Sequence, residues 1–336
     1  MKRVLTAAGV LLLLAAGAVI AAKSLDRAPA AVVLPAAPVI ASDPERPAEV
    51  WQIESTNIAD LYSNGLRVEK LYATRNRARS YIAHVLNRDG NCGQRRSAPA
   101  GIVFHTTESP QLPFDRRHSE RLNLVGKSLL DYVQSKRAYN FVVDRFGRVH
   151  QVVVESDAAN HAGHSVWADE QTLYVNLNDS FLGVSFEALT EPGQIASTLT
   201  APQLRSAQAL TEMLRSRYSI AAGNCVTHAQ VSVNPANMRV GYHTDWASGF
   251  PFKQVGLPDN YALPLPAIWA FGFDYDPAFL RATGSRMHTG VALAEERVRL
   301  AAEAVNTPAS EYRRELRKRY RSPGQCGAGL IKGETT

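Results

Sequence analysis

Three polar side chains within one short stretch have the chemistry to bind a metal ion. His228, His243 and Asp245 all lie between residues 226 and 252, a window too polar for an ordinary buried strand. Imidazole nitrogen and carboxylate oxygen suit zinc, and a catalytic zinc usually takes three protein groups and leaves a fourth position for water. These three residues count as two ligands and a spare, so a third ligand is expected from elsewhere in the chain, and His105 is the best candidate. Spacing alone does not rank His243 against Asp245, because an extended chain places both on one face.

Two short strands are predicted to carry the two histidines. The apolar run from residue 100 to residue 104 predicts a buried strand that ends at His105, and residues 225–229 predict another that carries His228. Strand ends are where open sheets place their chemistry, so the two histidines can meet if the strands are neighbours. Two imidazoles and a carboxylate leave zinc with residual positive charge, which activates water and polarises a carbonyl. The predicted chemistry is amide hydrolysis.

The remaining elements of this region alternate between helix and strand. Residues 122–133 have helical spacing, and residues 139–154 contain two strand runs around a glycine-containing turn. Residues 181–188 return to strand, and residues 200–203 match a capping box that opens a helix. This order predicts an α/β domain at about 95–255, with a mixed central β-sheet covered by helices.

Helical extensions are expected on both sides of this domain. Residues 50–94 are predicted to be a helical N-terminal extension, because their apolar residues fall within reach of one helical face. Residues 256–336 are expected to form a C-terminal extension, in which 257–273 wraps the surface and helices follow at 291–304 and 310–320. The last helix is rich in arginine. A solvated basic face is the default interpretation, and contact with a polymer or membrane is the functional alternative.

The first residues of the chain predict export. Residues 1–3 are Met-Lys-Arg, and residues 4–22 form an uncharged apolar run almost long enough to span a bilayer core. A cleaved signal peptide and a retained membrane anchor both remain open. Residues 23–49 are rich in alanine and proline and predict a linker. We expect an exported protein, periplasmic or anchored to the inner membrane through residues 4–22.

Composition fits a globular exported protein. The 336 residues are 45% hydrophobic, with a formal net charge of +6. This charge favours anionic polymers or surfaces without identifying one, and an ordinary basic surface explains it equally well. The three cysteines are Cys92, Cys225 and Cys326, and two of them could bridge in an oxidising compartment. No Cys-x-x-Cys pair is present, so a cysteine-based metal site is not expected.

Six motifs occur in an order that resembles a known family. They are FHTTE at 104–108, YNFVVDRFG at 139–147, HAGHS at 161–165, LGV at 182–184, TH at 227–228 and HTD at 243–245. Together they resemble the zinc-dependent N-acetylmuramoyl-L-alanine amidases of the type 2 family, which also contains phage amidase lysozymes and peptidoglycan recognition proteins. The resemblance runs from about residue 100 to residue 252. No single motif is diagnostic, but six in the right order are specific.

The resemblance implies a metal site and a reaction. It implies Zn²⁺ held by His105, His228 and Asp245, and hydrolysis of the amide that joins the lactyl group of N-acetylmuramic acid to L-alanine. Tyr139 matches a tyrosine that contacts the metal-bound water or the developing oxyanion in some members. His243 stands where other members have a lysine, and an imidazole could stabilise the same charge.

Two further positions follow from the same comparison. Many members carry a general-base glutamate where this chain has Ser185. Glu187 lies two residues on and, by strand alternation, on the same face, so it is a catalytic candidate; a surface carboxylate is an equal alternative. His161 matches the family's His-Ala-Gly, which implies a substrate-binding position in the cleft. The alternative for His161 is a loop histidine bonded to backbone.

The leading hypothesis is a zinc amidase that cuts peptidoglycan or muropeptides during cell-wall remodelling or turnover, with no nucleic-acid partner. A non-catalytic peptidoglycan-binding module and a zinc amidohydrolase acting on another amide are the alternatives. Relatives that bind without cutting generally lose a metal ligand, whereas all three positions are filled here. The oligomeric state does not follow from the sequence.

Overall fold

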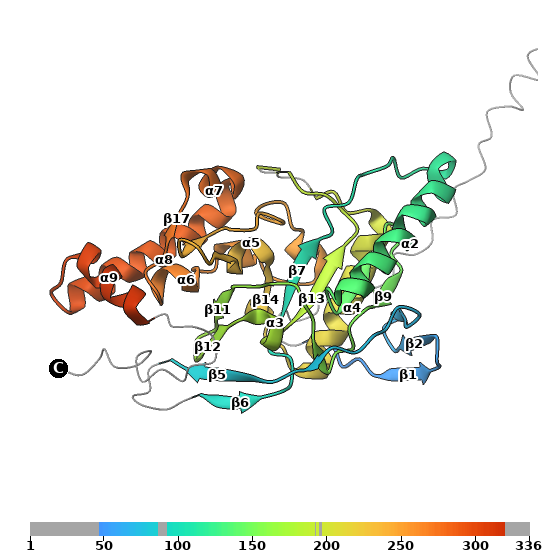
Figure 1. The fold of residues 1–336 in the computed structure, drawn as a ribbon, viewed down its shortest axis with the longest axis horizontal. Coiled ribbons are helices and arrows are strands. Elements are labelled where there is room, and N and C mark those ends of the chain that lie inside the picture. Colours follow the sequence, from blue (N-terminus) through green and yellow to red (C-terminus); the bar gives the residue numbers. More distant parts are fainter. Residues whose placement is uncertain (1–46, 87–92, 192, 195–196, 320–336) are drawn as a thin grey trace, which may run out of the picture. The chain divides into compact units, whose positions relative to one another are not determined.

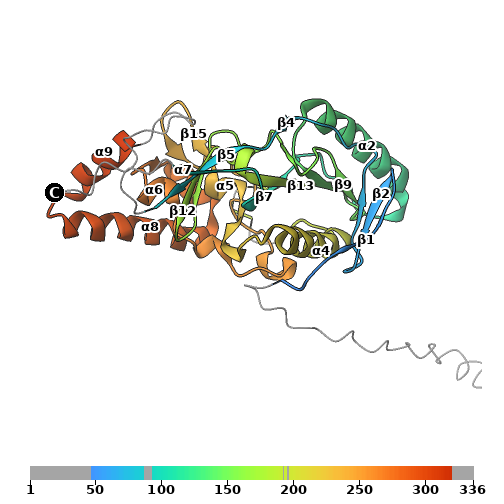
Figure 2. The same ribbon diagram turned by 90° about the horizontal axis from the view of Figure 1, so that it is seen from below.

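The computed structural model describes residues 47–86, 93–191, 193–194 and 197–319 (Figures 1 and 2). The predicted signal or anchor at 1–22 and most of the predicted linker lie outside these residues, as do Cys92 and Cys326. Cys225 is described as a free, buried thiol, and burial raises its pKa to about 12. Within the described residues, no helix has the length and apolar character needed to cross a membrane.

Strands and helices alternate along much of the described chain. The strands are β1 (Gln52–Ser55), β2 (Ala59–Tyr62), β3 (Arg67–Glu69), β4 (Arg77–Ala78), β5 (Tyr81–Val85), β6 (Gln94–Arg96), β7 (Gly101–Thr106), β8 (Phe141–Val143), β9 (Val149–Gln151), β10 (Asp157–Ala158), β11 (Val166–Ala168), β12 (Thr172–Val175), β13 (Phe181–Phe186), β14 (Cys225–Thr227), β15 (Val233–Asn234), β16 (Arg239–Val240) and β17 (Asp274–Tyr275). The α-helices are α2 (Ser119–Lys136), α3 (Leu177–Ser180), α4 (Ala201–Tyr218), α5 (His228–Val231), α6 (Pro266–Trp269), α7 (Pro277–Ala282), α8 (Gly284–Ala304) and α9 (Ala309–Arg319). Short 3₁₀ helices are η1 (Arg116–His118), η2 (Ala222–Asn224), η3 (Phe252–Val255) and η4 (Asn260–Ala262).

An eight-stranded mixed sheet forms the core, in the order β1-β2-β3-β9-β8-β13-β7-β14. Strands β8, β13, β7 and β14 run parallel to one another, and β13, β7 and β14 lie side by side at the centre of the fold (Figure 1). Every residue of β7, β13 and β14 is buried, which explains why these segments are apolar runs in the sequence rather than alternating patterns. Parallel strands end at the same edge of a sheet, so residues that follow β7 and β14 are brought together.

Helices α2 and α4 cover opposite sides of this sheet (Figure 2). The predicted capping box opens α4: the Gln203 backbone N–H donates to Thr200 Oγ1 over 3.3 Å, and the Thr200 backbone N–H donates to Gln203 Oε1 over 3.0 Å. The predicted hairpin is β8–β9, and its turn contains Gly147 at a φ of +80°. A Cβ there would lie 2.6 Å from the Pro202 carbonyl oxygen, so the turn requires glycine. The prediction of a mixed sheet covered by helices is confirmed.

The helical N-terminal extension predicted at 50–94 is wrong, because its described residues form six strands. Strands β1 to β3 add to the central sheet through β3, which pairs in parallel with β9. In β5, Tyr81 and Ala83 are buried while Ile82 and His84 are partly exposed. This period of two indicates a strand, and a search for one helical face overlooks it.

The chain after residue 255 joins the same hydrophobic core and does not wrap the surface at 257–273 as predicted. Leu257, Tyr261, Leu265 and Phe271 are each at most 3% exposed. Burial of these large side chains is favourable, and the proline-rich composition of the segment concealed it. The boundary predicted at 255 therefore does not separate two cores, and β17 pairs with β16.

The two predicted C-terminal helices are confirmed as α8 and α9. The basic character of α9 is partly used within the protein. Arg313 and Arg317 lie 3.1 Å and 2.7 Å from Asp274, so two of its arginines serve to dock the helix.

Candidate metal centre

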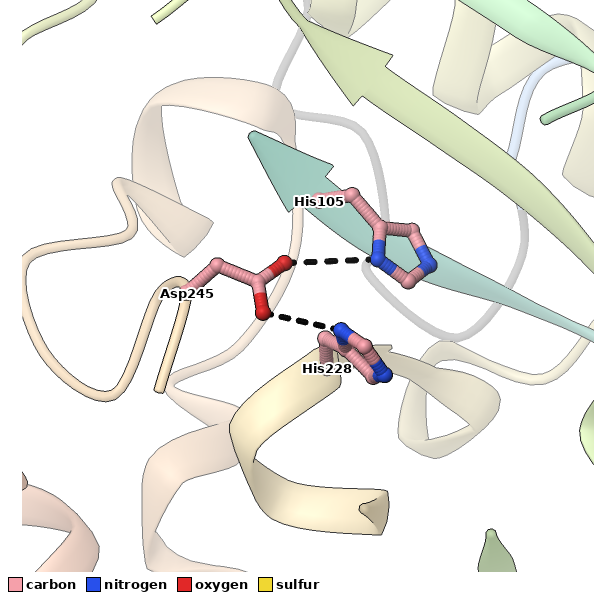
Figure 3. A group of neighbouring side chains, drawn as sticks. All are labelled: His105, His228 and Asp245. Carbon is pink, nitrogen blue, oxygen red and sulfur yellow. Dashed lines mark hydrogen bonds and ion pairs between the residues drawn. The ribbon is translucent and has the colours of Figure 1, made fainter. Parts of the chain in front are cut away.

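His105, His228 and Asp245 converge at the carboxyl ends of β7 and β14 (Figure 3). His105 lies near the end of β7, and His228 directly follows β14. The two strands are parallel neighbours with Thr227 opposite Phe104, so the residues that follow lie side by side. One ligand atom from each of the three side chains lies within 4.8 Å of the others. The three predicted ligands are thus brought together.

The chain turns sharply after β14, which ends the predicted strand two residues early. The Thr227 backbone N–H donates to Gln230 Oε1 over 2.9 Å, and α5 begins at His228. Asp245 lies in a turn, and its backbone carbonyl accepts from the Ala229 N–H over 3.3 Å. Strand alternation is therefore not what brings Asp245 to the site; hydrogen bonds between its loop and α5 are.

The Asp245 carboxylate lies between the two imidazoles. Its Oδ1 is 2.8 Å from His228 Nδ1, and its Oδ2 is 3.3 Å from His105 Nδ1 (Figure 3). Burial would raise the pKa of Asp245, but His228 lowers it through its proximity and its hydrogen bond, and the resulting pKa lies well below its usual value. Burial first, and then His228, lower the pKa of His105 to about 4. At neutral pH the site therefore combines a charged carboxylate with a neutral His105, as metal ligands require.

A chain of hydrogen bonds determines the tautomer of His105. His161 Nε2 is 3.3 Å from the Phe181 carbonyl oxygen, which can only accept, so Nε2 carries the proton of the neutral ring. His161 Nδ1 is therefore an acceptor, and it lies 3.1 Å from His105 Nε2, which donates to it. His105 Nδ1 is left with a lone pair that faces Asp245.

This arrangement fits a metal ion. A lone pair on His105 Nδ1 and an anionic oxygen of Asp245 face one another across 3.3 Å, which is unfavourable unless a cation lies between them. Two imidazoles and one carboxylate are a known zinc ligand set. His161 would then orient a ligand through its second ring nitrogen, as partners of metal-bound histidines usually do.

His161 lies beside the cluster, and its position bears on the predicted contact with substrate. Both of its ring nitrogens are bonded within the protein, which leaves neither free for the predicted contact with substrate. Burial, followed by His105 and Arg79, lowers its pKa well below the usual value, so the ring is neutral at neutral pH. The structure agrees with the alternative of a histidine bonded to backbone and adds a bond to His105.

Tyr139 and His243 both lie against the cluster, as predicted. The Tyr139 ring is 5.1 Å from that of His105, and its pKa is raised to about 12 by burial and by the charges of Asp245 and Glu108. The His243 ring stacks on His228 at 4.4 Å, with an angle of 18° between the rings. Burial and His228 lower the pKa of His243, so it is neutral at neutral pH.

Glu187 is not brought to the cluster. Its Oε2 accepts from the Arg145 backbone N–H over 3.1 Å, and the carboxylate lies against Gly126 of α2. Among the described contacts, none joins Glu187 to His105 or Asp245. The prediction that it takes over as general base is therefore not supported, because strand alternation fixes the face of a side chain but not where it points.

Glu108 is a candidate that sequence reasoning missed. It follows β7 three residues after His105, and its carboxylate accepts from the hydroxyls of Thr106 and Thr190. Its backbone has a φ of +51°, which is uncommon for a residue other than glycine. Residues with such a backbone conformation are found most often at functional sites. Its position three residues after the strand-end histidine was the available signal.

Comparison with known proteins agrees with the fold and the cluster. Residues 95–245 match the family model described as N-acetylmuramoyl-L-alanine amidase. This segment, with its α/β fold and its cluster of two histidines and one aspartate, is therefore similar to the N-acetylmuramoyl-L-alanine amidase family. No curated protein sequence matches the chain.

Three solved structures illustrate what the chain is similar to. A selenomethionine derivative of AmpD has 19% identity and a TM-score of 0.34, covering 55% of this chain and 93% of its own. AmiD from E. coli, in complex with anhydro-N-acetylmuramic acid-L-Ala-D-γ-Glu-L-Lys, has 21% identity and a TM-score of 0.34. The match covers 51% of this chain and 64% of the AmiD chain. AmpDh3 from Pseudomonas aeruginosa, in complex with anhydromuramic pentapeptide, has 19% identity and a TM-score of 0.36. The match covers 72% of this chain and 84% of the AmpDh3 chain.

Replacing His161 with alanine is expected to weaken zinc binding. Loss of the acceptor for His105 Nε2–H frees the ring to rotate and change tautomer, which should lower zinc affinity by about 10–100-fold, as for other residues that orient metal ligands. Competition with a fluorescent chelator measures this. His164→Ala is the matched control, because His164 is an exposed histidine of the same loop; equal affinity losses in both variants would contradict the role of His161.

Proposed function

We propose that this protein hydrolyses the amide between N-acetylmuramic acid and L-alanine in peptidoglycan or muropeptides, with Zn²⁺ held by His105, His228 and Asp245. The observation that carries the proposal is the complete three-ligand cluster within a segment that matches the amidase family. Zinc, when bound there, supplies a Lewis acid that polarises the amide carbonyl and lowers the pKa of water.

Two side chains beside the cluster are suited to stabilise the oxyanion of the tetrahedral intermediate. Tyr139 has a pKa of about 12, so its hydroxyl remains a hydrogen-bond donor at neutral pH. His243 stacks on His228 and is an exposed residue, so its ring N–H can reach substrate. Donors aimed at developing charge stabilise the transition state more than the ground state.

The proton acceptor for the attacking water is proposed to be Glu108. Ser185 stands where many members have a glutamate, and a hydroxyl cannot act as a base at neutral pH. Of the two nearby carboxylates, Glu108 has a charge that reaches Tyr139, whereas Glu187 is held against α2. The Thr106 and Thr190 hydroxyls orient Glu108 at the end of β7.

We also propose that the reaction takes place in the periplasm, with the protein either free or attached to the inner membrane through residues 4–22. The apolar run and the preceding positive residues support export. Peptidoglycan also lies outside the cytoplasm, which agrees with a domain of the amidase family.

The proposal predicts zinc-dependent release of stem peptides from purified sacculi by the full chain. Removal of zinc, or His105→Ala, should lower the rate at least about 1,000-fold, because the polarising charge is lost. Mass spectrometry of the released products identifies the bond cut. Intact sacculi in the presence of stoichiometric zinc would favour a non-catalytic binding module, and products cut elsewhere would favour a different amidohydrolase.

Two variants separate ligation from transition-state stabilisation. His243→Ala should keep its zinc and lose about 10²–10³ in kcat, the typical cost of removing one oxyanion donor. Asp245→Ala should lose both zinc and turnover. Metal analysis alongside kinetics measures this, and the reverse pattern would exchange the roles of the two residues.

A matched pair of variants tests the general base. Glu108→Gln should lower kcat by about 10²–10⁴ while zinc content and thermal stability stay unchanged, because only proton transfer is lost. Glu187→Gln should change kcat less than about twofold, since its carboxylate bonds to Arg145 away from the cluster. A large loss in Glu187→Gln with none in Glu108→Gln would restore the prediction made from the sequence.

A further inference from the structure

A cleft of about 560 Å³ lies beside the loop that carries His243 and Asp245. One wall comes from residues 234–244, including Tyr242 and Thr244, which flank His243. The other wall comes from residues 276–282, beyond the segment that matches the amidase family. The C-terminal extension therefore contributes directly to the surroundings of the metal-binding loop.

The wall formed by α7 is packed tightly against that loop. Strand β17, just before α7, pairs in parallel with β16, just before the loop. Gly241 has a φ of +80°, and a Cβ there would collide with the ring of Phe279 in α7. Because glycine permits this close approach, the cleft is held in place by backbone pairing and by buried aromatic contact.

Hydrogen-bond donors dominate the polar side chains of the cleft. Asn234 Oδ1 accepts from the Ala236 N–H, and Asn237 Oδ1 accepts from the Arg239 N–H, over 2.9 Å and 3.1 Å. With both oxygens engaged, each amide presents its NH₂ group as the remaining partner for a ligand. Neutral donors at two positions favour a ligand rich in acceptors.

Positive charge adds to these donors. Arg281 is exposed, and among the described residues no ion pair or hydrogen bond of its guanidinium is found. Arg239 forms a long ion pair with Asp276, in which Nη1 lies 3.6 Å from Oδ2. The other oxygen of Asp276 caps α7 by accepting from Ala278 N–H over 2.8 Å. The lining of the cleft thus contains two guanidinium groups but one carboxylate, and both oxygens of that carboxylate already have partners.

We propose that this cleft, named here the arginine cleft, binds the stem peptide of the substrate through a free carboxylate that pairs with Arg281. The inference rests on the proposed amidase function and assigns the peptide side of the scissile amide to the arginine cleft. A guanidinium binds a carboxylate with paired, charge-assisted hydrogen bonds. Val240, Ala278 and Phe279 supply an apolar surface for the peptide chain. A neutral sugar would instead require both donors and acceptors.

The test compares two synthetic muramyl peptides that differ only in whether the peptide carboxylates are free or amidated. In the full chain with zinc bound, Arg281→Gln should raise KM for the free-carboxylate substrate about tenfold, the loss of one charge-assisted contact. KM for the amidated substrate, kcat and zinc content should change less than twofold. Arg281→Glu should increase the difference between the two substrates. Arg314→Gln, an exposed arginine of α9 outside the arginine cleft, is the control and should match the parent.

Equal KM changes for both substrates, or none for either, would overturn the inference while leaving the amidase function intact. If the parent with zinc turns over neither substrate, the proposed function fails, and calorimetric binding of the same two peptides then decides the inference. Tighter binding of the free-carboxylate peptide, lost in Arg281→Gln, would support the arginine cleft. Binding that ignores the carboxylate would refute it.

Discussion

The carboxylate of Asp245, buried between two imidazoles, is the interaction on which the rest of the site depends. Its side chain is only 10% exposed, and a buried charge is costly unless it is compensated. Parallel pairing of β7 with β14 supplies His105 and His228 as its partners. Ser232 bonds to the backbone of His243 at both N–H and carbonyl, which holds the loop in place. The packing of α7 on Gly241 supports the same loop from the outside.

The hydrogen bonds behind the cluster explain why it suits a cation. The Phe181 carbonyl places the proton of His161 on Nε2, and His161 Nδ1 in turn places the proton of His105 on Nε2. The lone pair on His105 Nδ1 then faces a negative oxygen of Asp245. Such an arrangement costs free energy in the absence of a positive charge and provides a preorganised ligand set in its presence. The neighbours Tyr139 and His243 are neutral donors, so they can stabilise negative charge beside the cluster, as the proposed amide hydrolysis requires.

Much of the catalytic domain could be predicted from the sequence, because its central strands are apolar runs and α2 and α4 carry clear helical signals. The three ligands were predicted through motif order, whereas spacing could not rank His243 against Asp245, since their loop is not extended. The bond between His161 and His105 connects residues far apart in the sequence and leaves no local pattern. Glu187 was assigned from alternation alone, which says nothing about the direction of a long side chain. Strands such as β4 and β17 contain two residues each, so only their pairing partners define them.

The extension after residue 255 is part of the same structural unit as the segment that matches the amidase family. It shares the hydrophobic core, adds β17 beside the metal-binding loop and supplies a wall of the arginine cleft. The site is therefore shaped by residues on both sides of the matched segment.

We propose that two imidazoles and one carboxylate bind zinc in this protein. X-ray absorption at the zinc edge of the purified full chain measures this ligand set. We expect only nitrogen and oxygen ligands at about 2.0–2.2 Å, with a signature of two imidazoles. A sulfur ligand at about 2.3 Å, or a spectrum without imidazole scattering, would contradict it.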